Sequence, residues 1–536
     1  MLASLFRRLI SRLGAVDRGT RQAVPAPGKQ SSHLASDISR LLQAARERYD
    51  AGNLTAAGSL LQDVLLLDGG NRDALYYRGI IAGRLGDYAG ARMLLEKAVA
   101  QDPKFIDGLN ALANIEGLQE QWGKAQDLYR RALALEPDSV TVWCNLGLCL
   151  RAAGELDAAE SALRKARELA PDFPEALLNL AMVATDLGRS MEARELLQRC
   201  LGVKPGLAEA HTGLAHLLLQ NGEFEQGWRE YEWRFKCQDA ERQREYPLPR
   251  WDGRPIREQV LLIRAEQGLG DQLMFASCLP HAIARARLCL VECEPRLAGL
   301  FARSFPQAKV FPHYSKREPQ WQRDGFAPDY QIHLGNLPAL FRLKLADFPS
   351  HHGYLRADPA RVEFWRGRLA GLGAGLKIGI SWRGGAHSTR RTLRSLQLAE
   401  WLPVLRQKQA AFVSLQYGDC RGEIDALART AGVTVHHWQE AIDDYDQTAA
   451  LADALDRVIS VQTAAAHLTG TLGKPAWVLV PAIPEWRYMA QGEIMPWYPS
   501  MMLLRQHQRG DWRPVIERIA AMLGAEIINA GKTAAA

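Results

Sequence analysis

Two turns in the carboxy-terminal part of the chain carry residue types that suit group-transfer chemistry. In the first, Arg264–Phe275, Gly268 and Gly270 permit a tight backbone turn, and Asp271 stands where a helix is expected to begin. A carboxylate in such a turn can act as a general base that removes the proton of a hydroxyl group. Asp is also a favoured helix N-cap, so a purely structural role is the alternative. The turn lacks the third glycine of the dinucleotide-binding fingerprint.

The second turn follows an apolar run, Arg457–Val461, that is typical of a buried strand. It brings Thr463, Ala464 and His467 to the start of an expected helix. Free N–H groups and the helix dipole attract phosphate there, and alanine leaves room for close approach. His467 either contacts a ligand or packs inside the helix, and both interpretations stay open. Lys474 follows the helix, so it has the wrong spacing for the lysine of a phosphate-binding loop.

No metal site or cofactor is expected. Asp443 and Asp446 form an Asp-x-Asp pair, a manganese motif in one class of glycosyltransferases. The pair precedes an expected helix at Gln447–Leu455, which favours Asp446 as its N-cap. The His and Cys residues show no zinc-ligand spacing.

Short apolar runs followed by glycine-rich or polar turns indicate parallel sheets with crossover helices. The runs are Val260–Arg264, Leu288–Glu292, Lys377–Trp382, Phe412–Gln416, Arg457–Val461 and Ala476–Val480. A helix at Arg361–Ala374 separates the first two runs from the others. We therefore expect two Rossmann-like, doubly wound halves at 245–365 and 375–525, with a tail at 526–536. Ligands of such sheets bind beyond the carboxyl ends of the strands, in the turns and the cleft between the halves.

The preceding residues repeat with a period of about 34. Five blocks, from 38 to 207, align without insertion, and a partial sixth begins at Ala208. Small residues recur in both halves of each block, and a proline stands near the end of most blocks. The small residues are Ala45, Gly79, Ala113, Gly147, Ala181 and Ala215, then Ala57, Ala91, Ala125, Ala159, Ala193 and Gly227; the prolines are Pro103, Pro137, Pro171 and Pro205. This pattern resembles the tetratricopeptide repeat (TPR), which implies an α solenoid over 38–237 with a concave groove for peptides or proteins.

A second resemblance rests on a series of motifs between residues 220 and 520. The motifs are Glu266-Gln-Gly-Leu-Gly-Asp, Gly379-Ile-Ser-Trp-Arg-Gly-Gly, Arg394-Ser395, Ser414-Leu-Gln, His467-Leu-Thr-Gly-Thr-Leu-Gly-Lys-Pro, Trp486-Arg487, Trp497-Tyr-Pro-Ser and Arg505-Gln506. In this order they are similar to bacterial TPR-linked glycosyltransferases of the GT-B fold. These belong with the heptosyltransferase-like and O-linked N-acetylglucosamine-transferase-like enzymes. The resemblance implies an inverting, metal-independent transfer of a sugar from a nucleotide-sugar donor.

The resemblance also implies roles for particular residues. Asp271 corresponds to the proposed base, in an acceptor turn formed with Gln267, Gly268 and Gly270. The carboxy-terminal half corresponds to the donor side. There, Gln462, Thr463, Ala464 and His467 would meet the diphosphate or ribose, Arg383 or Arg394 would neutralise the leaving group, and Gln416 would reach the base.

Two positions depart from the family pattern. Gln462 replaces the usual aspartate of Val-Asp-Thr, which implies an altered donor choice, an altered phosphate geometry or a weakened activity. Leu396-Gln397 replaces the usual Ile-Pro, which implies only a changed loop.

On the expected inner helices, Asn145 and Asn179 occupy equivalent repeat positions. Asparagines clasp the substrate backbone in O-linked N-acetylglucosamine transferase, and an amide both donates and accepts hydrogen bonds. A structural role for these two residues is the alternative. A protein-reading solenoid joined to a transfer module favours a protein acceptor, with flagellin or another surface protein as the analogy.

The composition excludes several classes. Hydrophobic residues make up 47% of the 536 residues, charged residues 24%, and the net charge is only +6, which is typical of a globular protein rather than a nucleic-acid binder. The 8 scattered cysteines favour reduced thiols and the cytoplasm. Residues 1–37 are expected to be a basic tail and linker; a membrane-surface helix within 1–20 is the less favoured alternative. No stretch has the roughly 20 apolar residues that a membrane-spanning helix needs.

Three functions remain. The preferred one is a protein glycosyltransferase whose repeats recruit the acceptor. The second is a TPR scaffold with a catalytically weakened GT-B module, which the Gln462 departure favours. The third is a transferase that acts on a lipid-linked or capsular saccharide.

Overall fold

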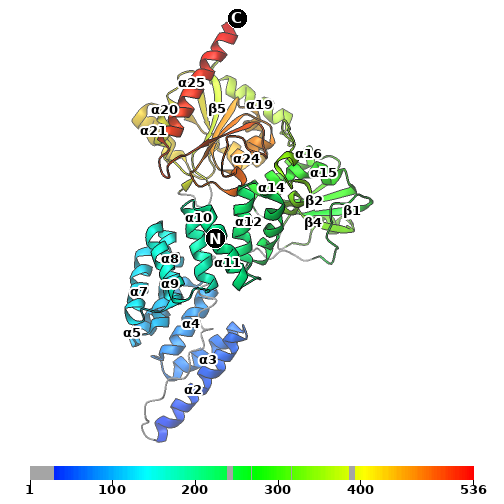
Figure 1. Cartoon of the computed structure of the whole chain (residues 1–536). Coiled ribbons are helices and arrows are strands. Elements are labelled where there is room, and N and C mark those ends of the chain that lie inside the picture. Colours follow the sequence, from blue (N-terminus) through cyan, green and yellow to red (C-terminus); the bar gives the residue numbers. More distant parts are fainter. Residues whose placement is uncertain (1–28, 238–245, 267, 315–316, 385–392, 536) are drawn as a thin grey trace. The chain divides into compact units, whose positions relative to one another are not determined.

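A computed structural model describes residues 29–237, 246–266, 268–314, 317–384 and 393–535 (Figure 1). Side chains are described within 33–529 of these ranges. The chain forms two compact units, the first ending at Ala210 and the second running from His211, apart from a few residues around Lys236. The expected contact of residues 1–20 with a membrane lies outside the described residues. Among the described residues, no helix is both long and apolar enough to cross a bilayer.

The first unit consists of paired helices, as the repeat pattern predicts. The helices are α2 (Lys29–Asp50), α3 (Leu54–Leu67), α4 (Arg72–Arg84), α5 (Tyr88–Gln101), α6 (Ile106–Leu118), α7 (Trp122–Leu135), α8 (Val140–Ala153), α9 (Leu156–Leu169), α10 (Pro174–Asp186) and α11 (Ser190–Val203). Helix α2 begins before the first repeat block. The expected TPR solenoid is confirmed.

Small residues are required where the two helices of a repeat cross. A Cβ atom on Gly79 would lie 2.7 Å from Cγ of Leu95, and one on Gly147 would lie 2.5 Å from Cγ of Leu163. Both distances are shorter than van der Waals contact, so a larger residue would push the helices apart. The repeat signature is therefore a packing constraint.

The turn inside each repeat reverses the chain through one residue with left-handed backbone geometry. This residue is Gly52, Gly86, Glu120, Gly154, Gly188 and Gly222 in successive repeats. Glu120, with φ 60°, is the non-glycine among them. A side chain disfavours this conformation by roughly 1–2 kcal/mol, so the third repeat carries a local cost that the others avoid.

The second unit begins with the last helix pair, α12 (Ala208–Gln220) and α13 (Phe224–Tyr231), and a 3-10 turn, η1 (Glu232–Lys236). The repeat pattern places this pair in the solenoid, which was expected to end at 237. The unit boundary at His211 instead groups most of it with the α/β part.

The first sheet of the second unit has four parallel strands in the order β3-β2-β1-β4. The strands are β1 (Ile256–Arg264), β2 (Ala286–Cys293), β3 (Lys309–Pro312) and β4 (Tyr330–His333). The accompanying helices are α14 (Leu269–Phe275), α15 (Leu279–Ile283), α16 (Ala298–Ser304), α17 (Gln320–Arg323) and α18 (Pro338–Phe341). The short strands β3 and β4 carry too few apolar residues for the sequence pattern to predict them.

The second sheet has six parallel strands in the order β10-β9-β8-β5-β6-β7. The strands are β5 (Leu376–Ser381), β6 (Ala410–Ser414), β7 (Val435–His436), β8 (Arg457–Val461), β9 (Ala476–Val480) and β10 (Met501–Arg505). The helices are α19 (Pro359–Ala370), α20 (Leu402–Leu405), α21 (Arg421–Ala431), α22 (Gln439–Asp443), α23 (Tyr445–Ala454), α24 (Ala464–Thr471) and α25 (Arg513–Ala535). Helix α25 continues through 526–535, which the sequence analysis treats as a tail. The predicted α/β module with two parallel sheets is confirmed.

One detail of the sequence analysis is wrong. The N-cap of α23 is Asp444, whose carboxylate accepts a hydrogen bond from the backbone N–H of Asp446. Asp446 instead lies in the first turn and pairs with Arg303. The helix begins two residues earlier than predicted, and its first residue, Tyr445, packs against the core.

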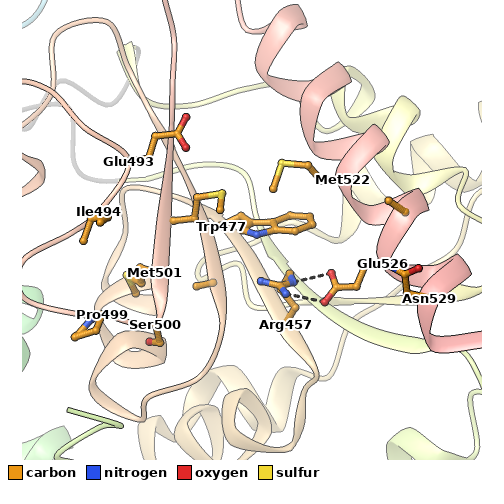
Figure 2. A pocket seen from close by; sticks show the side chains of 13 residues that line it. Arg457, Trp477, Glu493, Ile494, Pro499, Ser500, Met501, Met522, Glu526 and Asn529 are labelled. Atoms are coloured by element: carbon orange, nitrogen blue, oxygen red, sulfur yellow. Dashed lines mark hydrogen bonds and ion pairs between the residues drawn. The ribbon is translucent and has the colours of Figure 1, made fainter. Parts of the chain in front are cut away.

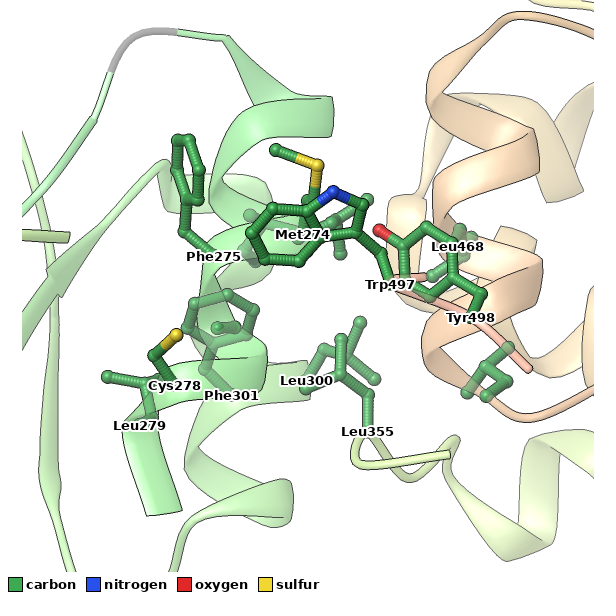
Figure 3. Packing of buried hydrophobic residues seen from close by; sticks show 14 of the residues in the cluster. Met274, Phe275, Cys278, Leu279, Leu300, Phe301, Leu355, Leu468, Trp497 and Tyr498 are labelled. Carbon is green, nitrogen blue, oxygen red and sulfur yellow. The ribbon is translucent and has the colours of Figure 1, made fainter. Parts of the chain in front are cut away.

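One hydrophobic cluster contains residues of both sheets, and two smaller clusters each pack against one sheet alone. Figure 3 shows Met274 and Phe275 of α14 in the same cluster as Leu468 of α24, Trp497 and Tyr498. All five side chains are buried. This cluster fixes the two turns that the sequence analysis singled out against each other.

Candidate functional site

The carboxyl end of β1 positions Asp271. After Arg264 the chain turns through Gly268, with φ 79°, and enters α14 at Leu269. Gly268 is the N-cap, so Asp271 lies in the first turn and does not cap the helix. Gln272 closes the turn by donating to the carbonyl of Glu266 at 2.5 Å. The predicted acceptor-turn residue Gln267 lies outside the described residues.

Asp271 is held by an arginine from the other half of the α/β unit. Nε of Arg487 lies 2.8 Å from Oδ1 of Asp271, and a second guanidinium nitrogen contacts the same oxygen. The side chains of Arg487 and Asp271 expose only 17% and 20%. Burial raises the pKa of Asp271, and Arg487 opposes that effect. Burial disfavours the charged form of Arg487, but Asp271 and Glu485 outweigh it and raise the pKa of the guanidinium.

A second arginine joins this cluster through Glu485. Arg394 lies 2.6 Å from one oxygen of Glu485, and Arg487 lies 2.7 Å from the other. The result is a row of alternating charges, Arg394, Glu485, Arg487 and Asp271. The structure thus brings two predicted site residues, Arg394 and Asp271, into one cluster. Arg487 was part of the motif series but received no role, and Glu485 was not singled out.

His467 lies between the same two turns as a packed residue. A Cβ atom on Gly270 would lie 3.1 Å from Cδ2 of His467, so the glycine lets the first turn approach α24. Nδ1 of His467 is 3.0 Å from the Tyr498 hydroxyl, and Nε2 is 3.3 Å from the Tyr488 hydroxyl. Burial, followed by Arg487 and Arg394, lowers the pKa of His467 to about 3. The imidazole is therefore neutral, and its two nitrogens are engaged by tyrosines.

The N-terminus of α24 is capped from inside. The Thr463 hydroxyl accepts from the N–H of Ala466 at 3.3 Å and lies 3.0 Å from the Ser460 hydroxyl. Ala464 is the first helical residue. A Cβ atom on Gly384 would lie 2.8 Å from the carbonyl oxygen of Gln462, so the chain after β5 passes close to this helix start.

Gln462 stands out among the buried polar side chains. It exposes only 2%, and neither its amide nitrogen nor its amide oxygen has a hydrogen-bond partner among the residues that the structure describes. An unpaired buried amide costs roughly 1–3 kcal/mol, which a polar ligand or water can recover. This residue marks a polar, unsatisfied position directly before Thr463.

Gln416 and Arg383 are used within the protein. The amide oxygen of Gln416 accepts from the N–H of Arg383 at 2.8 Å, and its amide nitrogen donates to the Arg383 carbonyl at 3.0 Å. The Arg383 side chain pairs with Glu423 at 3.0 Å. Both residues therefore join the ends of β5 and β6, and they do not meet the Asp271 cluster through any contact among the described residues.

The last repeat helix pair supports the Asp271 turn. Arg234 lies 2.6 Å from Glu266, and the same guanidinium nitrogen donates to Asn336 at 2.6 Å. Trp228 donates to the carbonyl of Arg342 at 2.8 Å and lies with its ring centroid 5.6 Å from that of Trp486. Glu266 and Trp486 flank Asp271 and Arg487 in sequence, so the helix pair is part of the architecture around the cluster. A long sequence separation conceals this link from pattern analysis.

The two predicted groove asparagines are both buried. Asn145 exposes only 2% and donates to the amide oxygen of Asn110 at 2.8 Å. Asn179 exposes 6%. Asn145 is thus used between neighbouring repeats, which matches the structural alternative of the sequence analysis.

A groove lies away from these residues, at the amino ends of β8, β9 and β10 (Figure 2). It has a volume of about 720 Å³ and contains Trp477 and Met522, with an ion pair between Arg457 and Glu526. Parallel sheets bind ligands at the opposite edge. Within the described residues, no group of three or more His, Cys, Asp or Glu side chains is arranged to hold a metal ion.

Two models of TPR families match the repeat region. The family model of the tetratricopeptide repeat matches residues 42–104, and that of the cilia and flagella-associated protein 70 middle TPR-like domain matches residues 109–234. The chain is therefore a TPR protein with an amino-terminal repeat solenoid and a carboxy-terminal α/β module.

Individual known proteins are similar to parts of this chain. Protein FlbA of Caulobacter vibrioides is 36% identical over 329 residues, which cover 58% of this chain and 54% of FlbA. The chain thus matches about half of the length of that relative. A thermophilic TPR protein of Thermus thermophilus is 23% identical and covers 34% of this chain and 99% of its own, with a TM-score of 0.31. PilF of Pseudomonas aeruginosa is 18% identical and covers 38% of this chain and 91% of its own, with a TM-score of 0.33.

Proposed function

We propose that this protein is an inverting, metal-independent glycosyltransferase. It moves a sugar from a nucleotide-sugar donor to a hydroxyl group of a protein acceptor that the TPR solenoid recruits. The acceptor class includes flagellin or another surface protein, and the transfer takes place in the cytoplasm, the compartment that the scattered cysteines favour. TPR solenoids generally bind protein segments, which supports the acceptor assignment.

The observation that carries the proposal is the position of Asp271. It is a largely buried carboxylate at the carboxyl end of a parallel strand, where such sheets bind ligands, and it adjoins the start of α24 through the Gly270–His467 contact. A carboxylate whose pKa is raised by burial is a better base for a hydroxyl proton than an exposed one. In this role Asp271 takes the acceptor proton while the oxygen attacks the anomeric carbon.

The donor side is supported by charge. Arg394 and Arg487 share one carboxylate, Glu485, so an anion that binds there meets more than one positive group. When the bond between the sugar and the nucleotide breaks, the phosphate gains negative charge, which such cations stabilise. Gln462 supplies an unsatisfied amide beside the helix N-terminus.

The first test is thermal unfolding of the full chain with UDP, GDP, ADP or CMP added singly. A nucleotide at 100 times its dissociation constant adds about 2.7 kcal/mol to the stability of the unit that binds it, a shift of several degrees. One clear response supports a donor site and names the nucleotide. No response from any of the four argues against the transferase.

The second test is Asp271→Asn. The amide keeps the size of the side chain but cannot accept the proton, so transfer should fall by roughly 10²–10⁴-fold. Asp425, exposed on α21, provides the matched control Asp425→Asn, which should leave transfer unchanged. Equal rates for both variants would remove Asp271 from the mechanism.

A TPR scaffold with a weakened module is the second candidate, favoured by Gln462 in place of the family's aspartate. In that case the solenoid still binds its partner, and no nucleotide-sugar is consumed. A saccharide acceptor, lipid-linked or capsular, is the third; transfer to it would survive deletion of the repeats that a protein acceptor requires.

A further inference from the structure

The pairing of Asp271 with Arg487 joins residues that are 216 positions apart in the chain. Both guanidinium contacts go to the same oxygen, Oδ1 of Asp271. In this arrangement the lone pairs of that oxygen are directed at a cation. A buried carboxylate in such a pair is a weaker base toward a hydroxyl group than the same carboxylate without its cation, because accepting a proton would cost the ion pair.

Other ionisable groups surround the pair. Glu266 and Glu485 are the acidic neighbours that act on Asp271, and Arg234 neutralises Glu266. The hydroxyls of Tyr231, Tyr488 and Tyr498 also interact electrostatically with Asp271, and burial raises the pKa of all three. His467 contacts the turn as a neutral ring. Of the described groups that act on Asp271, Arg487 is the one that pairs with its carboxylate.

We infer that Arg487 is a positioning residue that holds Asp271 through an ion pair before the donor binds. When the donor phosphates arrive, the guanidinium of Arg487 leaves Asp271 and pairs with them. Asp271 is then free to act as the base. This inference rests on the proposed function and adds the order of events: the donor binds first, and the acceptor hydroxyl is activated second.

The exchange follows from charge. Arg487 lies between two carboxylates, and an arriving diphosphate offers a planar guanidinium a bidentate partner with higher charge than either. Arg394, held by the other oxygen of Glu485, can take up the carboxylate that Arg487 leaves. A ligand shifts such an equilibrium only by its differential affinity, and the phosphate provides it.

The departure of Arg487 raises the pKa of the largely buried Asp271 further, and its carboxylate accepts the proton of the acceptor hydroxyl. The acceptor oxygen forms a bond to the anomeric carbon, and the bond from that carbon to the phosphate oxygen breaks. The electron pair stays on the nucleotide, beside Arg487.

Asp271 and the donor phosphates compete for Arg487, and this competition predicts how substitutions change nucleotide affinity. Asp271→Asn removes the carboxylate that competes with phosphate for Arg487, so it should bind the responding nucleotide diphosphate about tenfold more tightly while transfer is lost. Arg487→Gln should bind it about tenfold more weakly. In Asp271→Asn/Arg487→Gln, the tightening should disappear, since no guanidinium remains to be released.

The experiment is isothermal titration of the full chain with UDP, then GDP, ADP and CMP. Arg457→Gln is the control, because Arg457 also forms a partly buried pair, with Glu526, at the opposite edge of the same sheet. It should bind like the unchanged protein. If Arg487→Gln unfolds, Arg487→Lys keeps the charge, and the tightening by Asp271→Asn remains measurable alone.

The outcomes separate the two proposals. If a nucleotide binds and Asp271→Asn leaves its affinity unchanged or weaker, the exchange is wrong and the transferase proposal stands. If none of the four nucleotides binds the unchanged protein or Asp271→Asn, the donor site itself is wrong, and the exchange falls with it.

Discussion

The solenoid and the α/β unit satisfy their buried polar groups over different distances along the chain. In the solenoid, Arg151 pairs with Asp186 and Asn145 with Asn110, each across 35 positions, about one repeat. In the α/β unit, Asp271 pairs with Arg487 across 216 positions. A repeat therefore depends on its neighbour, whereas the candidate site depends on the whole unit.

At the last helix pair, α12 and α13, contacts between neighbouring repeats give way to long-range contacts. Its sequence follows the repeat, but its contacts are long-range: Gln220 donates to the carbonyl of Pro484 across 264 positions. Trp228 and Tyr231 enter the core that the two sheets share. Membership in a repeat series thus does not settle which unit a helix stabilises.

Deleting residues 1–210 should have the largest effect on function. The α/β unit keeps α13 and the part of α12 from His211 onward, so it should fold and retain its nucleotide response. Modification of a protein acceptor should fall by roughly 10²–10⁴-fold, because the acceptor is no longer tethered. Rates with a protein acceptor and thermal shifts with nucleotide measure the two properties. Deletion of 1–237 is the contrasting variant, and it should fail to fold. Undiminished modification after the shorter deletion would contradict recruitment by the repeats.

Trp228→Ala should be the most damaging single change to stability. The indole exposes 2% and donates to Arg342, so its loss should cost roughly 3–5 kcal/mol in the α/β unit. Trp143→Ala is the comparison in the solenoid, because Trp143 is only half-buried, although its indole donates to Pro137. Urea unfolding should show a much smaller loss for Trp143→Ala. Similar losses would mean that α13 belongs energetically with the repeats.

Acid should destabilise the α/β unit through His467 and His333, whose pKa values are lowered to about 3. Burial is the main cause for both, with nearby arginines adding to it. The unfolded histidines take up protons below about pH 6.5, so stability should fall as pH drops from about 6.5 to 3, by up to about 1.4 kcal/mol per pH unit for each group. Stability measured across this window should fall less steeply for His467→Gln. The same substitution at the exposed His507 is the control. If the free energy of unfolding of His467→Gln falls with pH as steeply as that of the unchanged protein, His467 does not cause the acid destabilisation.

Glu120→Gly should give the smallest effect, a gain of about 0.5–1 kcal/mol in the solenoid. The change removes the side-chain cost of left-handed geometry at this turn, and the greater freedom of glycine in the unfolded chain offsets part of the gain. Gly86→Glu is the reverse substitution at the equivalent turn of the preceding repeat, and it should destabilise the solenoid by a similar amount. Chemical denaturation of both variants measures the difference, and a loss for Glu120→Gly would show that this side chain makes a contact that outweighs the strain.

Much of the fold was predictable from sequence. The repeat blocks and the longer strands carry local signals of period or composition, and these elements are confirmed. The edge strands β3, β4 and β7 were missed because they are short and carry few apolar residues. The edge strand β10 was missed although four of its five residues are apolar. The N-cap of α23 was misplaced by two residues, because Asp444 and Asp446 are equally good caps by type.

The candidate site was predictable in part. Sequence motifs singled out Asp271, Arg394, Gln462 and His467, but they gave no partners. That Gln416 is used between β5 and β6, that two tyrosines hold His467 and that Arg487 holds Asp271 all depend on contacts between distant segments. A residue type and its spacing cannot report such contacts.

The sequence alone determined the repeat architecture, because each repeat packs on its neighbour through residues whose spacing is constant. It also determined that parallel strands end in turns with Asp271 and Thr463. Only the tertiary structure decided that Gly270 contacts His467, that the last repeat packs into the α/β core and that Arg487 forms an ion pair with Asp271. The physical reason is that burial and pairing of charges are set by the packing of the whole unit, which no local pattern encodes.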